Sequence, residues 1–242
     1  MLPMFMQKPF DVQYFQHIKR LFGTALIGYW PVDEAAGAST VTDYSGQSNN
    51  GTPSNVTFGQ AGIGDGRTSG SFNGTSSKLN LYSAGLNGDF SGAEGTIAFW
   101  AKPSAAGVWT DSTYRWFVEF FVDVNNWVFI RKENTDNTIL FNYTAGSTQE
   151  QLSVEFSSGP FFHVAMTWSA AADAVVYYLN GINRGSDSAL GTWAGSLAVD
   201  KSAFGWSPAN NDFYWSGNIQ HGILLNRPST QPEITELMRV SV

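Results

Sequence analysis

The sequence predicts an all-β globular protein, and three observations support this. Of the 242 residues, 43% are hydrophobic and 15% aromatic, whereas only 14% are charged, which suits short strands better than Glu- and Lys-rich helices. The 25 glycines provide for many tight turns. Several segments alternate with a period of two, which places successive side chains on opposite faces of a strand.

Residues 1–24 are the exception, because their apolar residues recur at spacings of three and four, as on one face of a helix. Lys19 and Arg20 lie toward the end of this predicted helix and Gly23 follows it, in agreement with the helix dipole and with C-capping by glycine. Two interpretations are open: the helix packs on its own sandwich, or it is an arm that docks on a protein scaffold or a sister subunit. The residues predicted to make the docking contact are Phe10, Tyr14, Phe15, Ile18, Leu21 and Phe22.

Strand patterns begin after residue 25. Residues 96–103 (TIAFWAKP) and 161–168 (FFHVAMTW) alternate in the manner of strands with one apolar face. Residues 115–146 predict three further strands, separated at Asn125-Asn126 and at 133–137. Trp30, Trp100 and Trp168 fall inside strand patterns and are predicted to fill the core.

Two local signals predict a turn and a helix in the last third of the sequence. Asn180-Gly181 follows a strand pattern and favours the left-handed dihedrals of a type I′ hairpin turn. Thr230 and Glu233 have capping-box spacing, which predicts a short C-terminal helix. No linker or repeat interrupts residues 25–242, so we predict one domain preceded by the arm of residues 1–24.

The order of these segments resembles the LamG-like jelly rolls of the concanavalin A-like lectin/glucanase superfamily. The segments that carry the resemblance are LIGYWPVDEAAG, DYSGQSNNGT, SGSFNGTSSKLNL, GTIAFWAKP, FFHVAMTWSAAADAVVYYLNG and the tail FYWSGNIQHGILLNRPSTQPEITEL. The resemblance implies a jelly-roll sandwich of two antiparallel sheets, one of them curved with a concave face. The chain departs from the family at Gln220-His221, where acidic residues are common, and in its added N-terminal arm.

Composition excludes several classes of function. The net charge of −7 argues against nucleic-acid binding through phosphate contacts, and the absence of cysteine excludes disulfides and thiolate chemistry. No stretch approaches the roughly 20 apolar residues of a membrane span. The N-terminus lacks the features of a cleavable signal peptide. We therefore expect a location on a virion surface or, alternatively, extracellular release by another route.

A catalytic set is not evident in the sequence. Glycosidases need two carboxylates that flank one glycosidic bond, and the nearest candidates, Glu119 and Asp123, are predicted to be exposed strand acids too far apart for that role. The three histidines, His17, His163 and His221, have no metal-ligand spacing. We predict that the protein is not an enzyme.

Calcium is the metal ion whose preferred oxygen ligands the sequence supplies. The residues predicted to supply oxygen ligands are Asp33, Asp43, Asn49 and Asn50, with Glu34 as a further candidate. The alternative is turn chemistry, in which the same Asp and Asn side chains accept hydrogen bonds from nearby backbone groups. Related domains often hold calcium at a loop edge, so both interpretations stay open.

Loop aromatics are the candidate ligand contacts, because aromatic rings beside amides stack on sugar rings or anchor protein interfaces. The stretch WSPANNDFYWSG stands out, and the residues predicted to bind ligand are Trp193, Trp206, Asn210, Asn211, Tyr214 and Trp215. The alternative is that the loop tryptophans cap the ends of the sandwich.

Two functions follow from these observations. The first is a non-catalytic structural or attachment protein on an assembly, most plausibly a phage or virus particle, docked through residues 1–24. The second is a soluble or extracellular carbohydrate-binding or adhesion module that uses the loop aromatics, with or without calcium. A glycoside hydrolase is a distant third.

Overall fold

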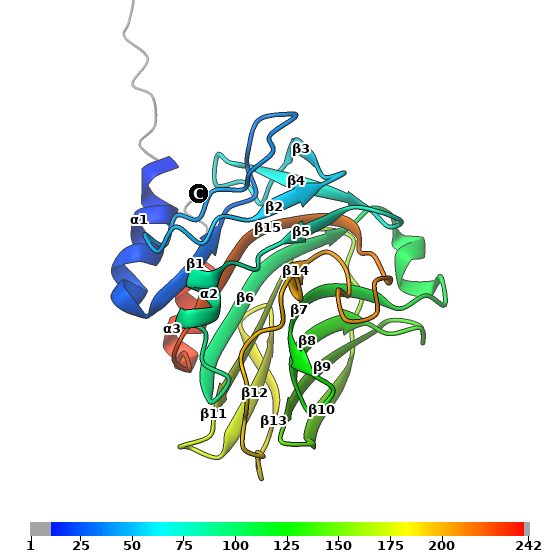
Figure 1. Cartoon of the computed structure of the whole chain (residues 1–242). Coiled ribbons are helices and arrows are strands. Elements are labelled where there is room, and N and C mark those ends of the chain that lie inside the picture. Colours follow the sequence, from blue (N-terminus) through cyan, green and yellow to red (C-terminus); the bar gives the residue numbers. More distant parts are fainter. Residues whose placement is uncertain (1–10, 240–242) are drawn as a thin grey trace, which may run out of the picture.

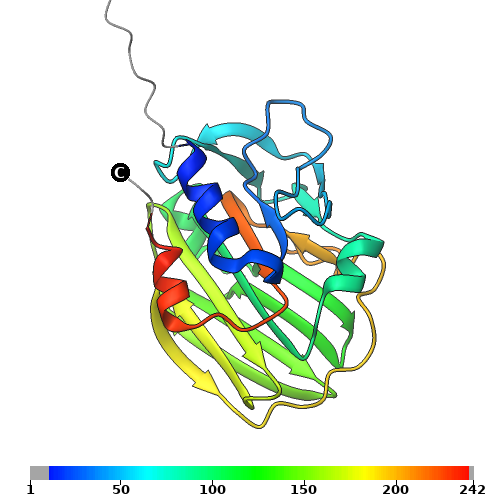
Figure 2. The same cartoon turned by 90° about the vertical axis from the view of Figure 1, so that its left-hand side faces the viewer.

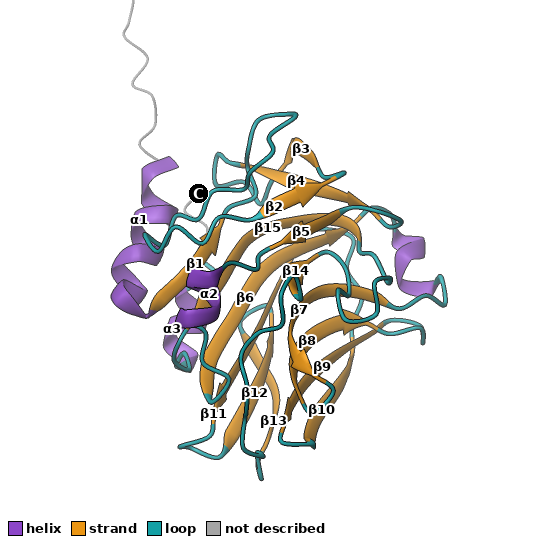
Figure 3. Cartoon of the chain, viewed as in Figure 1, coloured by secondary structure: helices purple, strands orange, loops and turns teal. Residues whose placement is uncertain are grey.

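Two antiparallel sheets form the molecule, as the sequence predicts (Figures 1 and 3). The computed structural model describes residues 11–239. The first sheet has the strand order β13 (Ile182–Asp187), β12 (Ala174–Leu179), β11 (Phe162–Ser169), β6 (Glu94–Pro103), β15 (Ser216–Leu225), β4 (Thr68–Asn73) and β3 (Thr57–Ala61), with β1 (Leu26–Trp30) also paired to β15. We call it the helix-covered sheet.

The second sheet, which we call the open sheet, contains seven strands. Their order is β10 (Thr148–Glu155), β9 (Thr138–Ala145), β8 (Asn126–Lys132), β7 (Arg115–Asp123), β14 (Ser202–Phe204), β5 (Lys78–Asn80) and β2 (Thr52–Ser54). Strands β7, β8 and β9 confirm the three strands predicted over residues 115–146. The Asn180-Gly181 hairpin is confirmed too, with φ of 50° and 74° at its two turn residues.

The main core lies between the two sheets and is built from the inward face of each strand. Ile97 and Phe99 of β6 lie in the same cluster as Val128 and Ile130 of β8, and each is buried. Trp30 and Trp168 belong to this core, as predicted, and neither is exposed. Trp100 differs, because the alternation of β6 turns its side chain to the opposite face of the sheet.

Helices α1 (Asp11–Phe22) and α3 (Gln231–Glu236) lie across the outer face of the helix-covered sheet (Figure 2). Helix α3 begins with the predicted capping box, in which the Thr230 side chain accepts from the Glu233 N–H and Glu233 reaches back to the Thr230 backbone. The third helix, α2 (Ala84–Asp89), is capped by the Ser83 hydroxyl. No helix of residues 11–239 is both long and apolar enough to cross a membrane.

The apolar face of α1 packs on its own sandwich. Tyr14, Ile18 and Phe22 are at most 4% exposed and form a second cluster with residues of β15, such as Ile223. The Tyr14 hydroxyl also donates to the Leu237 carbonyl at 3.0 Å, which joins α1 to the end of the chain. These contacts correct the docking prediction for the three side chains, because the chain's own sheet already occupies them.

Two other predicted docking residues are less buried. Phe15 and Leu21 are half-buried, and the Phe15 ring stacks on Tyr29 with centroids 5.8 Å apart. Phe10 lies outside the described residues.

A polar network lies beneath α1 at the position where the chain departs from the family pattern. The imidazole of His221 bridges the Tyr29 hydroxyl and the Asp65 carboxylate, each at 2.8 Å, and all three side chains are buried. Gln220 donates to Asp65 and accepts from the Ile63 N–H at 2.8 Å. The Gln220-His221 pair thus holds the loop between β3 and β4 against β15.

We predict that shortening Ile18 to valine lowers the free energy of unfolding by about 1 kcal/mol, because a buried methyl group is lost. Urea denaturation at neutral pH measures this, with the exposed Gln16→Ala as the matched control on the same helix. A docking role for Ile18 predicts instead an unchanged stability together with a changed oligomeric mass.

Candidate functional site

The outer face of the open sheet carries aromatic and amide side chains in register. One cross-strand row runs from Glu119 through Phe129 and Asn142 to Gln151. The next row contains Phe121, Trp127, Thr144 and Gln149. The inward neighbours, such as Val128 and Ile130, are aliphatic, so the sheet has a core face and a distinct outer face.

The aromatic rings of this face form a continuous ridge. Phe121 contacts Trp127 with centroids 5.8 Å apart, and Trp127 contacts Phe129 at 4.6 Å. Trp116 continues the ridge at 5.3 Å from Phe129 and stacks on Phe213 at 5.0 Å. Phe121, Trp127 and Phe213 keep part of their surface exposed, so the ridge presents aromatic surface to solvent.

A guanidinium group stabilises one end of the ridge. Arg131 lies 4.5 Å from the Tyr114 centroid, 4.6 Å from Trp116 and 5.1 Å from Phe129, and its Nε donates to Glu133 at 2.7 Å. Such cation–π contacts favour a fixed arrangement of the rings. The aromatic surface is therefore preorganised rather than formed by loose side chains.

Amides lie directly beside the ridge. The buried Asn142 accepts from Gln149 Nε2 at 3.0 Å and from Gln151 Nε2 at 2.8 Å, while its own amide donates to the Thr144 hydroxyl at 3.1 Å. Gln149 and Gln151 remain exposed and keep their carbonyl oxygens available. The face thus combines flat apolar surface with neutral donors and acceptors.

The loop of residues 205–214 covers part of this face and is held by Glu119. The Glu119 carboxylate accepts from the Ser207 hydroxyl at 2.9 Å and from the Ala209 N–H at 2.8 Å. Burial raises the pKa of Glu119 to about 7, although these two hydrogen bonds act in the opposite direction. The prediction that Glu119 is an exposed strand acid is wrong, because the loop covers the carboxyl completely.

The same loop holds several predicted ligand residues. Trp206 stacks on Tyr214 with centroids 6.0 Å apart, and the Lys78 ammonium lies 4.3 Å from the Trp206 centroid. Asn210 and Asn211 are exposed at the tip. Trp206 is only 6% exposed, so it supports the loop more than it offers a ring to a ligand.

Two predicted ligand residues lie elsewhere. Trp215 is fully buried in the main core, 4.3 Å from Phe117, which contradicts its assignment to a ligand site. Trp193 packs on Phe90 and Tyr143 at the end of the sandwich, as the alternative interpretation expects. The structure therefore does not bring Trp193 or Trp215 together with the loop tip.

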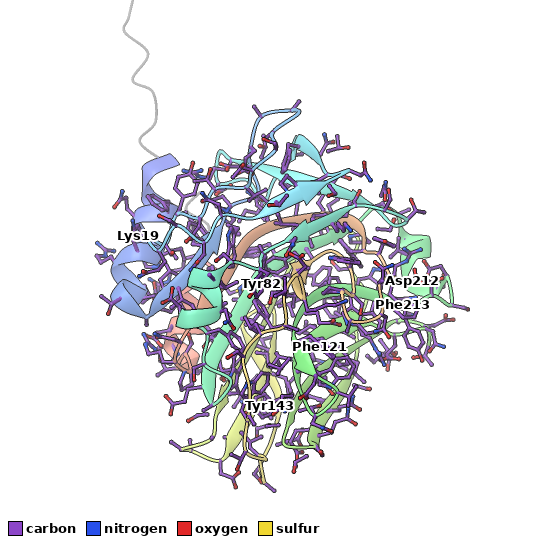
Figure 4. The ribbon with its side chains drawn as sticks, in the orientation of Figure 1. Lys19, Tyr82, Phe121, Tyr143, Asp212 and Phe213 are labelled. Atoms are coloured by element: carbon purple, nitrogen blue, oxygen red, sulfur yellow. The ribbon has the colours of Figure 1, made fainter. Side chains whose placement is uncertain are left out.

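Sequence reasoning missed the ridge itself. Phe121, Phe129 and Phe213 were not predicted as site residues, and neither was the amide group around Asn142. A signal for the ridge exists in β8, where Trp127, Phe129 and Arg131 alternate with aliphatic residues. Figure 4 shows Phe121 on the open sheet and Phe213 and Asp212 beside it on the loop, with Lys19 on α1 at the opposite side.

The predicted calcium ligand Asp43 is occupied by hydrogen-bond donors. One oxygen accepts from the Tyr29 and Ser45 N–H groups at 2.9 and 2.8 Å. The other accepts from the Ser45 hydroxyl at 2.7 Å and the Asn49 N–H at 2.8 Å. A carboxylate has about four lone-pair positions, so none remains for a metal ion.

The other predicted calcium ligands also form hydrogen bonds or ion pairs within the chain. Asp33 pairs with Arg67, and Asn50 accepts from the Asp43 N–H at 2.9 Å. The Asn49 side chain donates to the Ile27 carbonyl and accepts from the Ser83 hydroxyl. These contacts support turn chemistry at Asp43, Asn49 and Asn50. Glu34, the further candidate, accepts from the Thr42 N–H through one oxygen, whereas its other oxygen, Oε2, is buried without a hydrogen-bond partner among residues 11–239.

Acid–base and metal chemistry find little support among residues 11–239. Asp123 accepts from Asn125 and Asn126 at the β7–β8 turn, so it does not form a carboxylate pair with Glu119 on the sheet face. Burial lowers the pKa of His163 to about 3, which keeps its imidazole neutral. The described residues contain no cluster of three His, Asp or Glu side chains suited to a metal ion.

Comparisons with solved structures find the same fold. The binding domain of botulinum neurotoxin serotype D superposes with a TM-score of 0.66 at 16% identity, over 89% of this chain and 51% of that chain. A serotype D ligand-binding domain in complex with N-acetylneuraminic acid gives 0.68 at 14% identity, over 93% and 52%. The chain thus spans about half the length of these toxin domains.

A third structure matches over nearly its whole length. Domain 4 of an extracellular arabinanase from Geobacillus stearothermophilus, in complex with arabinotriose, superposes with a TM-score of 0.64 at 18% identity, over 88% of this chain and 98% of that one. No curated protein sequence matches the chain. The sequence model of the concanavalin A-like lectin/glucanases superfamily matches residues 73–235. The chain therefore belongs to the concanavalin A-like lectin/glucanases superfamily.

Proposed function

We propose that the protein is a non-catalytic carbohydrate-binding module whose binding surface is the outer face of the open sheet. The observation that carries this proposal is the row of half-exposed Phe121 and Trp127 beside Thr144 and Gln149. A sugar ring has an apolar face and a polar rim. It can stack on an aromatic ring while neighbouring side chains exchange hydrogen bonds with its hydroxyls.

The arrangement suits a neutral glycan. The exposed polar groups beside the ridge are the amides of Gln149 and Gln151, which carry no charge and can both donate and accept. Two of the matching structures are complexes with N-acetylneuraminic acid and with arabinotriose, which gives the proposal support at the level of the fold. The charged groups at the end of the ridge, Arg131 and Glu133, pair with each other at 2.7 Å, which leaves that end without a net charge and favours uncharged sugars over acidic ones on this face.

Hydrolysis is not part of the proposal. A glycosidase needs a second carboxyl group within roughly 5–10 Å of the first, on the other side of the scissile bond. The rows that form the ridge contain one carboxyl, Glu119, and its two oxygens hold Ser207 and Ala209. Glu119 therefore holds the loop of residues 205–214 in place through these hydrogen bonds.

A glycan array with the full chain tests the proposal. We expect selective binding of neutral glycans, and we expect Trp127→Ala or Phe121→Ala to weaken the best ligand at least about tenfold, equivalent to 1.4 kcal/mol. Phe15→Ala is the matched control, because Phe15 is also a half-buried aromatic but lies on α1, over the helix-covered sheet. If the wild type and the three variants bound the glycan equally well, the open sheet would not be the binding surface.

The attachment role stays a separate prediction. Burial of Tyr14, Ile18 and Phe22 removes most of the apolar face that was expected to meet a scaffold. Display on a virion and the extracellular alternative both stay proposals, and either is compatible with a sugar-binding face.

A further inference from the structure

The outer face of the helix-covered sheet is not covered along its whole length. Helices α1 and α3 pack over Ala98, Ala165 and Ile223, and the hydrogen bond from Trp100 Nε1 to the Tyr14 hydroxyl, at 3.4 Å, marks the limit of that cover. Beyond this limit lies a cavity of about 330 Å³. Its lining residues are Ala61, Gly62, Ile63, Trp100, Lys102, Pro160 and Phe161.

The walls of this cavity, which we call the Lys102 cavity, are fixed by the fold. The Trp100 ring is held by the hydrogen bond from its Nε1 to the Tyr14 hydroxyl and by the His163 ring, with centroids 5.2 Å apart. The opposite wall is the β3–β4 loop, which Gln220 fixes through the Ile63 N–H. A Cβ atom at Gly62 would lie only 2.4 Å from the Arg67 carbonyl oxygen, so the backbone approaches closely there.

One charged group faces this cavity. Lys102 lies on the same face of β6 as Trp100, and its ammonium is 5.9 Å from the Phe161 ring centroid. Among residues 11–239, no carboxylate lies within 4.0 Å of this ammonium. The nearby acids are engaged elsewhere, since Asp65 pairs with His221 and Asp33 with Arg67. The ammonium is therefore available to an anion from outside the described chain.

We infer that the Lys102 cavity binds a small organic anion, in which an apolar ring packs against the half-buried Ile63 and Phe161, over the buried Trp100, and a carboxylate pairs with Lys102. The volume lies at the lower limit of ligand sites, roughly 300–1,000 Å³, and so suits one ring rather than an oligosaccharide. A partly desolvated ammonium beside aromatic walls favours a carboxylate over a neutral polar group. Both an aromatic acid and a uronic acid sugar have this chemistry.

The inference is independent of glycan binding at the open sheet. The two surfaces lie on opposite outer faces of the sandwich and share no residue. Loss of one site by substitution should leave the other intact, so the two proposals fail separately.

A titration of the full chain, followed by ¹H–¹⁵N NMR, tests the site with benzoate and glucuronate as the two anionic probes. Benzyl alcohol and glucose are the neutral counterparts. We expect shifts of the Gly62, Ile63 and Lys102 amides and of the Trp100 indole N–H with at least one anion. The probe that produces them distinguishes an aromatic acid from an acidic sugar.

Lys102→Gln is the decisive variant, because it removes the charge and keeps most of the side chain. We expect it to weaken the anion at least about tenfold while the melting temperature stays unchanged. Lys78→Gln, on the outer face of the open sheet, is the matched control and should bind the anion like the wild type. Equal affinity for anion and neutral counterpart, shifts centred on the open sheet, or no shift with any probe would overturn the inference.

Discussion

Replacement of Asp43 with alanine is expected to lower the free energy of unfolding by about 4 kcal/mol, since hydrogen bonds to a charged group contribute roughly 1.5–3 kcal/mol each and do not add fully. The variant would leave the N–H groups of Tyr29, Ser45 and Asn49 without their acceptor. Asp43 is only 7% exposed, so water replaces these bonds poorly. Urea denaturation at neutral pH measures the loss.

The same experiment separates turn chemistry from calcium binding. Addition of calcium or of a chelator should leave the unfolding midpoint of the wild type unchanged, because the Asp43 oxygens already accept four hydrogen bonds. The exposed Asp136→Ala serves as a control and should change stability by less than about 0.5 kcal/mol. A chelator that destabilised the wild type as much as Asp43→Ala would restore the calcium hypothesis.

Glu119 is expected to make stability fall as the pH rises from about 4.5 to about 7. Its pKa is raised from 4.5 to about 7 in the folded chain by burial, so its stabilising contribution is complete below pH 4.5, where both states are protonated. Between pH 4.5 and pH 7 the Glu119 carboxyl is ionised in the unfolded chain but still protonated in the folded chain. This difference stabilises the unfolded state relative to the folded state. The shift corresponds to about 3 kcal/mol, lost progressively up to pH 7 and constant above it.

A comparison of the wild type with Glu119→Gln measures this contribution. The difference in their unfolding free energies should change by about 3 kcal/mol between pH 4 and pH 8. The buried His163, whose pKa is lowered to about 3, acts in the opposite direction below pH 6.5, but it is present in both proteins and cancels. Ser207→Ala is the control that keeps the carboxyl: it should keep the direction of the pH dependence, because the removed hydrogen bond only opposes the raised pKa of Glu119. A difference that does not vary with pH would contradict the account.

Local signals in the sequence predict the fold well. The Asn180-Gly181 turn, the Thr230–Glu233 capping box and the helix of α1 each depend on residues within a few positions of one another, and the structure confirms all three. The order of the strand patterns identifies the superfamily, because the resemblance depends on several segments in sequence. The fold class can therefore be predicted without knowledge of contacts between distant segments of the chain.

The site is different because it depends on register and burial. Phe129 meets Asn142, and Asn142 meets Gln151, only when β8, β9 and β10 pair in the observed register. The sequence does not distinguish Trp215, which faces the core, from Trp116, which faces outward. Asp43 is similar, since its partner Tyr29 lies 14 positions earlier in the chain. The wrong predictions for Asp43, Glu119 and Trp215 concern contacts between separate segments, whereas the one for Trp100 conflicts with the alternation within β6 itself.

Titration of the full chain with its best array glycan, followed by ¹H–¹⁵N NMR, tests the central claim most directly. The account predicts that the largest shifts fall on Phe121, Trp127, Thr144 and Gln149, including the Trp127 indole N–H, which has no acceptor among the described residues. Shifts centred on the Asp43 loop or on the Lys102 cavity, with the open sheet unchanged, would contradict it.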